Sequence, residues 1–342
     1  MSDPIRPSDS GAPVRDLHRR LLAVGHPVDE AEVSDDHFGP DTTRALLAFQ
    51  AERGIDEHGT VDATTQAALV EAGVRLGDRH LYLHAPMFRG DDVADLQLRL
   101  GSLGFDAGRI DGIFGPDTAG ALGDFQRNTG LAVDVIAGSE TVHAFRQLLG
   151  RSAGRTPVAQ VRELDRLRRG NPDLRDQRLA IGQFGNSGAL ISALARILRA
   201  RGANVLVLDN PDEAAQASTA NDFDAVMYLG LRIENSSHSQ ANYFSTPGFL
   251  SEGGYRLAHH CATCLDRALR SSDVPPTGAA GRQVPVLRQT RMPAVLCTLA
   301  PPSAVVLATA EIADALAVAI TRWVANPAAD PDNAPPVEDR SP

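Results

Sequence analysis

The feature that most constrains this chain is an internal repeat in its first half. The segment from Phe38 to Thr65 reappears from Phe114 to Thr141 at a constant offset, and both copies begin with Phe-Gly-Pro-Asp-Thr. A segment of this length that occurs twice is typical of one folding unit used twice. The sequence therefore predicts two small domains of the same fold before any other domain begins.

Each copy is predicted to fold as three helices. Val14, Leu17 and Leu21 have the i, i+3, i+7 spacing of one helical face, and the second copy repeats this pattern upstream of its motif. Pro40 and Pro116 then open a second helix at its first turn, where the missing N–H of proline is not needed. A short third helix follows the motif in each copy. Both modules are therefore expected to be all-α.

Most positions of the motif are explained by the fold itself. Ala45 and Phe49, like Ala121 and Phe125, lie four residues apart on one helical face, so they are predicted to belong to the core. Contact with a ligand stays open for the motif as a whole. Its residues are Phe38, Gly39, Thr42, Phe49 and Gln50 in the first copy, and Asp111, Gly112, Phe114, Gly115, Thr118, Phe125 and Gln126 in the second.

The second half of the chain alternates strand-like and helical patterns. Apolar runs occur at Arg178–Ile181, Asn204–Leu208, Ala225–Leu231 and Ala294–Leu299, with helical patterns between them. This alternation predicts an α/β domain with a mostly parallel sheet. The fold class is thus multidomain, with two small all-α three-helix modules followed by an α/β domain.

The expected parts of the chain follow one another with few gaps. They are a disordered N-terminus at 1–12, the first repeat at 13–75, the second repeat at 91–150, a linker at 151–177 with one exposed helix, the α/β domain at 178–325 and a disordered tail at 326–342. Ser152 and Thr156 in the linker are exposed candidates for phosphorylation.

Composition excludes several classes of partner. With 33 Lys and Arg against 43 Asp and Glu, the formal net charge of -10 disfavours nucleic acid as a non-specific partner. No apolar run is long enough to span a bilayer, and the N-terminus has no secretory pattern. Three cysteines do not form a disulfide framework. The cytoplasm is the predicted location, and a peripheral position at the membrane stays open.

The second repeat carries the sequence Asp111-Gly112-Ile113-Phe114-Gly115-Pro116-Asp117-Thr118, followed by Phe125-Gln126 and Gly130-Leu131. This pattern resembles the peptidoglycan-binding-domain-1 family, a small three-helix module attached to many cell-wall hydrolases. The first repeat departs from it with Asp35-Asp36-His37 ahead of its Phe. The resemblance implies that the partners are peptidoglycan fragments or muropeptide precursors.

Residues 178–325 resemble the zinc-dependent N-acetylmuramoyl-L-alanine amidase family (amidase 3). The residues that carry this resemblance are the strand Ala225–Arg232, Tyr243-Phe244, Ser251 and the run Leu287–Leu296. Two repeats ahead of such a domain is an order found in actinobacterial proteins. The resemblance implies hydrolysis of the amide between the muramic lactyl group and the first L-Ala of the stem peptide. It also implies a zinc ion held by two His and one Glu, with a further Glu as general base.

The zinc ligands that the resemblance implies are missing from the positions where they are expected. The loop after the first strand has no His, and Gln183 is the polar residue nearest to the expected Glu. Arg232 stands where the second His belongs, and Thr298 stands at the position of the general base. A guanidinium is never a metal donor. We therefore expect a pseudo-amidase with no catalytic residues, no metal and no other cofactor.

Three arginines offer another use for this region. Arg232, together with Arg288 and Arg291 on the approach to the last strand, is hypothesised to form an anion-binding groove, because a guanidinium binds carboxylate or phosphate bidentately. The alternative is that each arginine pairs with a nearby acid such as Glu234 or with a carbonyl.

Two further groups of residues can be interpreted either as functional sites or as buried core residues. His260 and Cys264 have the i, i+4 spacing of a metal-binding pair, but Cys264 also follows helical core spacing. Cys297 is a candidate nucleophile with His238 as its base, although an apolar strand usually buries its cysteine. The glycines between Gly182 and Gly188 do not match a phosphate-binding loop.

The leading hypothesis is a non-catalytic protein that binds peptidoglycan fragments or muropeptide precursors and regulates cell-wall synthesis, with a cell-wall synthesis enzyme as a second partner. The alternative is an active N-acetylmuramoyl-L-alanine amidase with rearranged ligands such as His238, His259 or His260. A third hypothesis is a scaffold whose repeats bind protein.

Overall fold

The computed structural model describes residues 4–149, 157–246, 249–269 and 275–329. The chain forms two compact units, Met1–Val161 and Arg162–Pro342, and each is described by itself. Ser152 and Thr156, the predicted phosphorylation candidates, lie outside the described residues.

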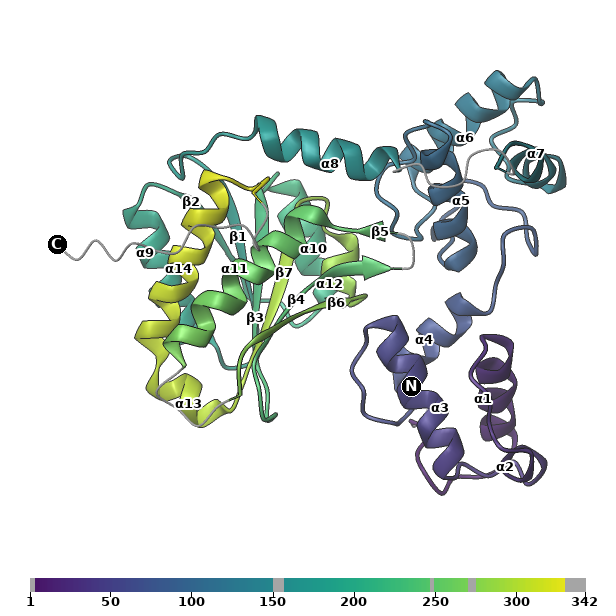
Figure 1. The fold of residues 1–342 in the computed structure, drawn as a ribbon, viewed down its shortest axis with the longest axis horizontal. Coiled ribbons are helices and arrows are strands. Elements are labelled where there is room, and N and C mark those ends of the chain that lie inside the picture. Colours follow the sequence, from purple (N-terminus) through teal and green to yellow (C-terminus); the bar gives the residue numbers. More distant parts are fainter. Residues whose placement is uncertain (1–3, 150–156, 247–248, 270–274, 330–342) are drawn as a thin grey trace. The chain divides into compact units, whose positions relative to one another are not determined.

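The first unit contains the two predicted helical repeats (Figure 1). The helices of the first repeat are α1 (Ala12–Ala23), α2 (Glu30–Ser34), α3 (Pro40–Arg53) and α4 (Ala63–Ala72), and those of the second are α5 (Asp91–Ser102), α6 (Pro116–Thr129) and α7 (Ser139–Leu149). Pro40 and Pro116 open their helices as predicted. Helix α2 is an addition that occupies the longer loop of the first copy.

Each repeat has its own core. Phe38, Ala45 and Phe49 are buried in the first repeat, and Phe114 and Phe125 are fully buried at the matching places in the second. The core prediction for these positions is confirmed. The third helix of the first repeat begins at Ala63, two residues before Thr65. Asp62 causes the earlier start, because its carboxylate accepts the Thr65 backbone N–H at 2.7 Å.

The expectation of disorder over residues 1–12 is wrong from Pro4 onward. The backbone of Ile5 pairs with Val61 through hydrogen bonds of 3.2 and 2.9 Å, and Phe38 donates its backbone N–H to Asp9 at 2.9 Å. These contacts give the polar backbone of the segment partners that its composition does not reveal. Residues 1–3 lie outside the described part of the chain.

The second unit is an α/β domain. Its helices are α8 (Val158–Arg169), α9 (Gly188–Ala200), α10 (Glu213–Asp222), α11 (Glu252–Ala268), α12 (Pro285–Gln289), α13 (Pro302–Leu307) and α14 (Thr309–Ala325), and its strands are β1 (Arg178–Phe184), β2 (Asn204–Leu208), β3 (Met227–Ile233), β4 (Gln240–Thr246), β5 (Phe249–Leu250), β6 (Gly278–Arg282) and β7 (Ala294–Leu299). The strand order is β2-β1-β3-β7-β4-β5, with β6 also paired to β4. Strands β2, β1, β3 and β7 are parallel, and β4 runs antiparallel to β7.

Helices cover both faces of this sheet (Figure 1). Apolar residues of α9, α11 and α14 pack on one face in a single core that includes Leu229, Cys297 and Trp323. Helices α10 and α12 pack against each other, and Gln216 of α10 meets Tyr228 from the opposite face. The mostly parallel sheet predicted from the alternating pattern is confirmed. None of the described helices is long and apolar enough to cross a membrane.

The segments expected to be linker and tail contribute to the α/β domain. Leu167 of α8 is buried in the domain core, and Glu163 accepts hydrogen bonds from the first residues of α11. Beyond α14, Arg256 donates to the Ala328 carbonyl at 2.8 Å. The expectation of disorder is therefore wrong for residues 326–329, whereas residues 330–342 lie outside the described part.

Candidate functional site

The carboxyl ends of the parallel strands bring together the positions that the sequence analysis had marked. Phe184 of β1 is the register partner of Arg232 on β3, and Arg232 is the partner of Thr298 on β7. Side chains at matched positions of adjacent strands point to the same face of a sheet. The three side chains therefore form one row at the edge where open α/β sheets usually bind ligands.

Arg232 is neutralised by two carboxylates that lie beside this row. Its guanidinium lies 2.6 Å from the Glu213 carboxylate and 3.9 Å from that of Glu234, and it stacks over the Phe184 ring at 4.8 Å. Glu213 also accepts the backbone N–H of Val286 at 3.1 Å, which ties α10 to α12. Arg232 therefore pairs with a nearby acid, which was the alternative to anion binding in the sequence analysis.

Glu213 was not found from the sequence. Its position after Asp212 at the start of α10 is the signal of an acidic first helical turn, and Asp212 caps this helix through the Ala214 backbone N–H. That signal predicts a helix start. It does not predict that the helix lies across the end of β3, which depends on the tertiary packing of α10.

The three arginines do not form the hypothesised groove. Arg291 precedes β7 and lies at the amino edge of the sheet, where its backbone N–H donates to Asn221 at 2.8 Å. Arg232 lies at the opposite edge, because the strand from Met227 to Arg232 separates the two by roughly 17 Å of extended chain. Arg288 belongs to α12, which packs on α10.

Buried polar contacts crowd the sheet face near Arg232. Tyr228 donates to Gln216 at 2.8 Å, and the Gln216 amide donates to the carbonyls of Gln183 and Asn210 at 2.9 and 2.6 Å. Burial raises the pKa of Tyr228. A Cβ atom at Gly182 would lie 2.0 Å from Gln216, so only glycine fits there. This glycine serves packing and not phosphate binding.

The glutamines of the repeat motif hold loops. The Gln126 amide donates to Asp134, Ile136 and Thr141 at 2.7 to 3.3 Å and accepts the Val135 backbone N–H at 2.9 Å. Gln50 makes the matching contacts in the first repeat with Thr60, Thr65 and Gly59. These two motif residues are therefore explained by the fold.

The second repeat has a further glutamine that holds a loop, Gln97, and the first repeat has no glutamine at the matching position. Gln97 donates to Asp111 and Thr118 at 2.9 and 3.1 Å and accepts two backbone N–H groups of the motif loop. In the first repeat His18 occupies the matching place, 2.7 Å from Thr42, and Glu32 binds the start of α3. The sequence departure at Asp35–His37 is thus matched by a different set of loop contacts.

The repeats differ in the groove between the end of their second helix and their third helix. In the second repeat this groove is a cavity of about 700 Å³, lined by Asn128, Thr129, Leu131, Ser139, Glu140, His143, Ala144, Gln147 and Leu148. In the first repeat Arg53 lies at the matching place and binds Asp91 of α5 at 2.7 Å. Ile55, at the place of Leu131, is only 3% exposed. The start of the second repeat therefore covers part of the first groove.

Comparison with known proteins bears on both units. A family described as a putative peptidoglycan binding domain matches residues 10–69 and 89–145. The N-acetylmuramoyl-L-alanine amidase CwlM of Mycobacterium tuberculosis is 33% identical over 329 residues, which cover 86% of this chain and 80% of that protein. The chain belongs to the N-acetylmuramoyl-L-alanine amidase family.

Two further matches cover less of the chain. The amidase CwlL of Bacillus licheniformis is 31% identical over 160 residues, or 41% of this chain and 44% of its own. The crystal structure of an N-acetylmuramoyl-L-alanine amidase from Clostridium difficile 630 covers 44% of this chain and 97% of its own, with 16% identity and a TM-score of 0.36.

The residues of this family member do not fit the zinc ion expected of an N-acetylmuramoyl-L-alanine amidase. The edge row offers a phenyl ring, a guanidinium and a threonine hydroxyl, and the nearest carboxylate, Glu213, is held by Arg232. Across the described ranges, no group of three or more His, Cys, Asp or Glu residues could hold a metal ion. No hydrolytic step can therefore be derived through zinc at this edge.

The competing cysteine and histidine constellations are not assembled as sites. Cys297 is fully buried beside Cys261, whereas His238 is exposed, so the proposed nucleophile and base do not meet. The hydrogen bond to Cys297, and then burial, raise the pKa of Cys261. Cys264 is buried as well, and burial lowers the pKa of His260. The three cysteines are buried core residues.

Proposed function

We propose that this chain binds peptidoglycan fragments or muropeptide precursors without cleaving them. The observation that carries the proposal is the ion pair of Arg232 with Glu213 at the edge where the family resemblance implies zinc. A guanidinium cannot coordinate and ionise a water molecule as a metal ion does, and water without a metal or a base is a poor nucleophile for an amide. The domain would then recognise wall material and not hydrolyse it.

The binding half of the proposal points to the second repeat. Its groove presents hydrogen-bonding groups from Asn128, Ser139, His143 and Gln147 beside the Glu140 carboxylate, and these groups suit the hydroxyl and amide groups of an amino-sugar peptide. The Nε2 atoms of His143 and Gln147 lie 2.8 Å apart, so one ligand group can contact both side chains.

The matching groove of the first repeat is poorly suited to the same ligand. Ala67 and Glu71 replace His143 and Gln147 there. A Cβ atom on Gly90, just before α5, would lie 3.2 Å from the Glu71 carbonyl oxygen, so the second repeat is packed against this place. The first repeat would then act as a support for the second.

Sedimentation of the full chain with purified sacculi tests the binding half. The exposed pair His143→Ala and Gln147→Ala should reduce the bound fraction at least fivefold, since both hydrogen-bonding groups are lost. Arg146→Gln lies on the same helix but outside the groove, and this control should bind like the wild type. Wild-type protein that stays in the supernatant would contradict the binding proposal.

Metal analysis and an activity assay test the other half. We expect purified protein to hold far less than stoichiometric zinc and to release no free amino groups from sacculi. The names of the relatives favour the alternative, an active N-acetylmuramoyl-L-alanine amidase. Stoichiometric zinc together with turnover would establish that alternative, with His238, His259 and His260 as the first positions to mutate.

Regulation of wall synthesis forms the last part of the proposal. A binding protein that does not cut can act only through another molecule, and a cell-wall synthesis enzyme is the partner that we propose. The cytoplasm, or the inner surface of the membrane, is the proposed location, and cell fractionation with an antibody to the chain would check it. Recovery only from the outer wall fraction would contradict it.

A further inference from the structure

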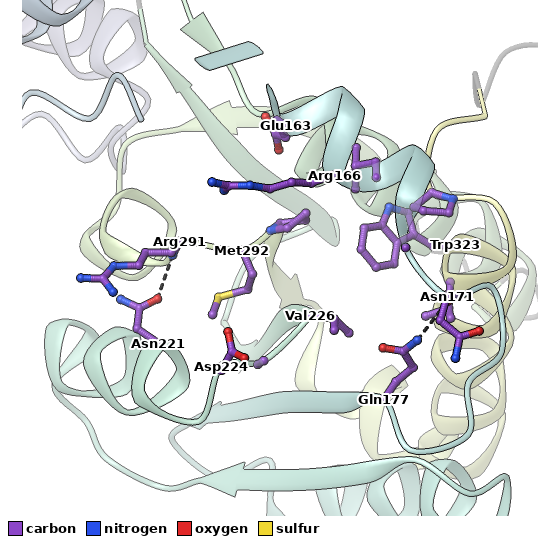
Figure 2. Close-up of a pocket in the computed structure, with 16 residues that line it drawn as sticks. Glu163, Arg166, Asn171, Gln177, Asn221, Asp224, Val226, Arg291, Met292 and Trp323 are labelled. Atoms are coloured by element: carbon purple, nitrogen blue, oxygen red, sulfur yellow. Dashed lines mark hydrogen bonds between the residues drawn. The ribbon is translucent and has the colours of Figure 1, made fainter. Parts of the chain in front are cut away.

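A second cavity lies at the amino edge of the sheet, opposite Arg232. It has a volume of about 530 Å³, within the range of roughly 300–1,000 Å³ that is typical of small-molecule sites. Figure 2 shows its walls, which come from α8, the loop that leads into β1, the starts of β3 and β7, and the end of α14. The family's zinc edge contributes nothing to it.

The floor of this cavity is apolar. Leu167, Met292, Trp323 and Val324 line it and are each less than 10% exposed, and Val226 lies between them. The Trp323 indole is fixed, because its N–H donates to the Gly253 carbonyl at 3.1 Å. A rigid apolar floor can bury an apolar ligand body without first rearranging.

The acids in the walls are already engaged. Glu163 accepts hydrogen bonds from the Ser251 hydroxyl and from the backbone N–H groups of Glu252 and Gly253, at 2.8 to 3.2 Å. Asp224 is paired with Arg178. Both carboxylates keep their negative charge, but neither forms an ion pair with an arginine that lines the cavity.

Two arginines of the cavity keep their charge without an acid partner. Among the residues that the structure describes, no carboxylate pairs with the side chain of Arg166 or Arg291, and both residues are exposed. In Figure 2 their guanidinium ends lie on one side of Met292, and Trp323 lies on the other side. The cavity thus has a cationic end and an apolar end.

We propose that this cavity binds an amphipathic anion. Its carboxylate or phosphate is held by Arg166 and Arg291, and its apolar body lies on Met292, Val226 and Trp323. Two guanidinium groups favour such a head group because charge-assisted hydrogen bonds are stronger than neutral ones. The proposal is independent of glycan binding by the repeats.

Trp323 gives a direct readout, because it is the only tryptophan of the chain. The probes are ω-bromo-octanoate and ω-bromo-octyl phosphate, whose terminal bromine quenches tryptophan fluorescence on contact. With the head group on the arginines, the bromine reaches the apolar end. We expect saturable quenching by one or both anions, and at least tenfold weaker quenching by the uncharged ω-bromo-octanol. The anion that binds more tightly shows whether the cavity prefers a carboxylate or a phosphate head group.

Variants of the full chain locate the head group. Arg166→Gln and Arg291→Gln should each weaken the anion at least tenfold, because each removes one charge from the cationic end. Arg169→Gln is the matched control, since Arg169 lies on the same helix, pairs with Asp165 and does not line the cavity. It should leave the affinity unchanged.

Trypsin cleavage of α8 supplies a second measurement that does not need the variants. A bound anion should slow cleavage after the exposed Arg166, because it contacts that side chain. The proposal is overturned if neither anion quenches saturably, if ω-bromo-octanol binds equally well, or if both cavity variants bind like the wild type.

Discussion

The ion pair at the carboxyl edge of the sheet can be tested by a double-mutant cycle. Glu213→Gln removes the charge but keeps an oxygen that can accept the Val286 backbone N–H, and Arg232→Met keeps an apolar stem against Phe184. The cycle therefore isolates the attraction between the two charges, provided that neither variant makes a new contact.

The magnitude follows from the exposure of the pair. The side chains of Arg232 and Glu213 are 23% and 17% exposed and 2.6 Å apart. Exposed pairs contribute about 0.2–1 kcal/mol to the free energy of unfolding, and breaking a buried pair costs about 3–5 kcal/mol. A partly buried pair lies between these limits, so we expect a coupling energy of about 1.5 kcal/mol.

Urea unfolding followed by Trp323 fluorescence is the assay, because the only tryptophan reports on the α/β domain alone. Each single variant should lower the unfolding midpoint, and the double variant should lose less than the two single variants together. The pair of Arg178 with Asp224, with side chains 46% and 81% exposed, is the control. Its coupling should be below about 0.5 kcal/mol.

One result would refute this reasoning. If the effects of Glu213→Gln and Arg232→Met add within about 0.3 kcal/mol, the two side chains do not interact in solution. Arg232 would then be available to an anion, and the hypothesis that it binds a ligand head group would return.

Three further predictions concern buried groups. Burial lowers the pKa of His18 below its ordinary value of 6.5, so the unfolded chain takes up its proton first as the pH falls. Stability should therefore decline from about pH 6.5 downward, and circular-dichroism melts of His18→Gln should show a weaker decline; identical slopes would contradict this. Gly182→Ala should lower the free energy of unfolding by about 3 kcal/mol, because the added Cβ has no room; an unchanged urea midpoint would argue against it. The native protein should react only slowly with a thiol reagent, because the three cysteines are buried; rapid labelling of Cys297 would revive its role as a nucleophile.

The repeats could be predicted from the sequence because their signals are local. Proline at a first helical turn and apolar residues four apart specify a helix and its buried face without reference to distant residues. The strand order and parallel pairing of the second domain were predictable only as a class, from the alternation of strands and helices. The pairing of Ile5 with Val61 was not predictable, because neither residue carries a signal for the other.

In the candidate site, too, the sequence predicted local features but not contacts between distant residues. The sequence placed Arg232 and Thr298 at positions that the structure makes neighbours, since a strand fixes the order of its residues and the family resemblance fixed the strands. It could not identify Glu213 as the partner of Arg232, because that contact depends on where α10 packs. For the same reason it grouped Arg291 with Arg232, although a whole strand separates them.

Charge now distinguishes the two edges of the sheet. At the carboxyl edge one guanidinium faces two carboxylates, Glu213 at 2.6 Å and Glu234 at 3.9 Å, so an incoming anion would meet repulsion as well as attraction. At the amino edge the cavity is lined by two arginines as well as two acids, Glu163 and Asp224, and among the described residues no carboxylate pairs with Arg166 or Arg291. An anionic ligand of this domain should therefore prefer the amino edge. At the carboxyl edge, by contrast, Arg232 already has a carboxylate partner in Glu213.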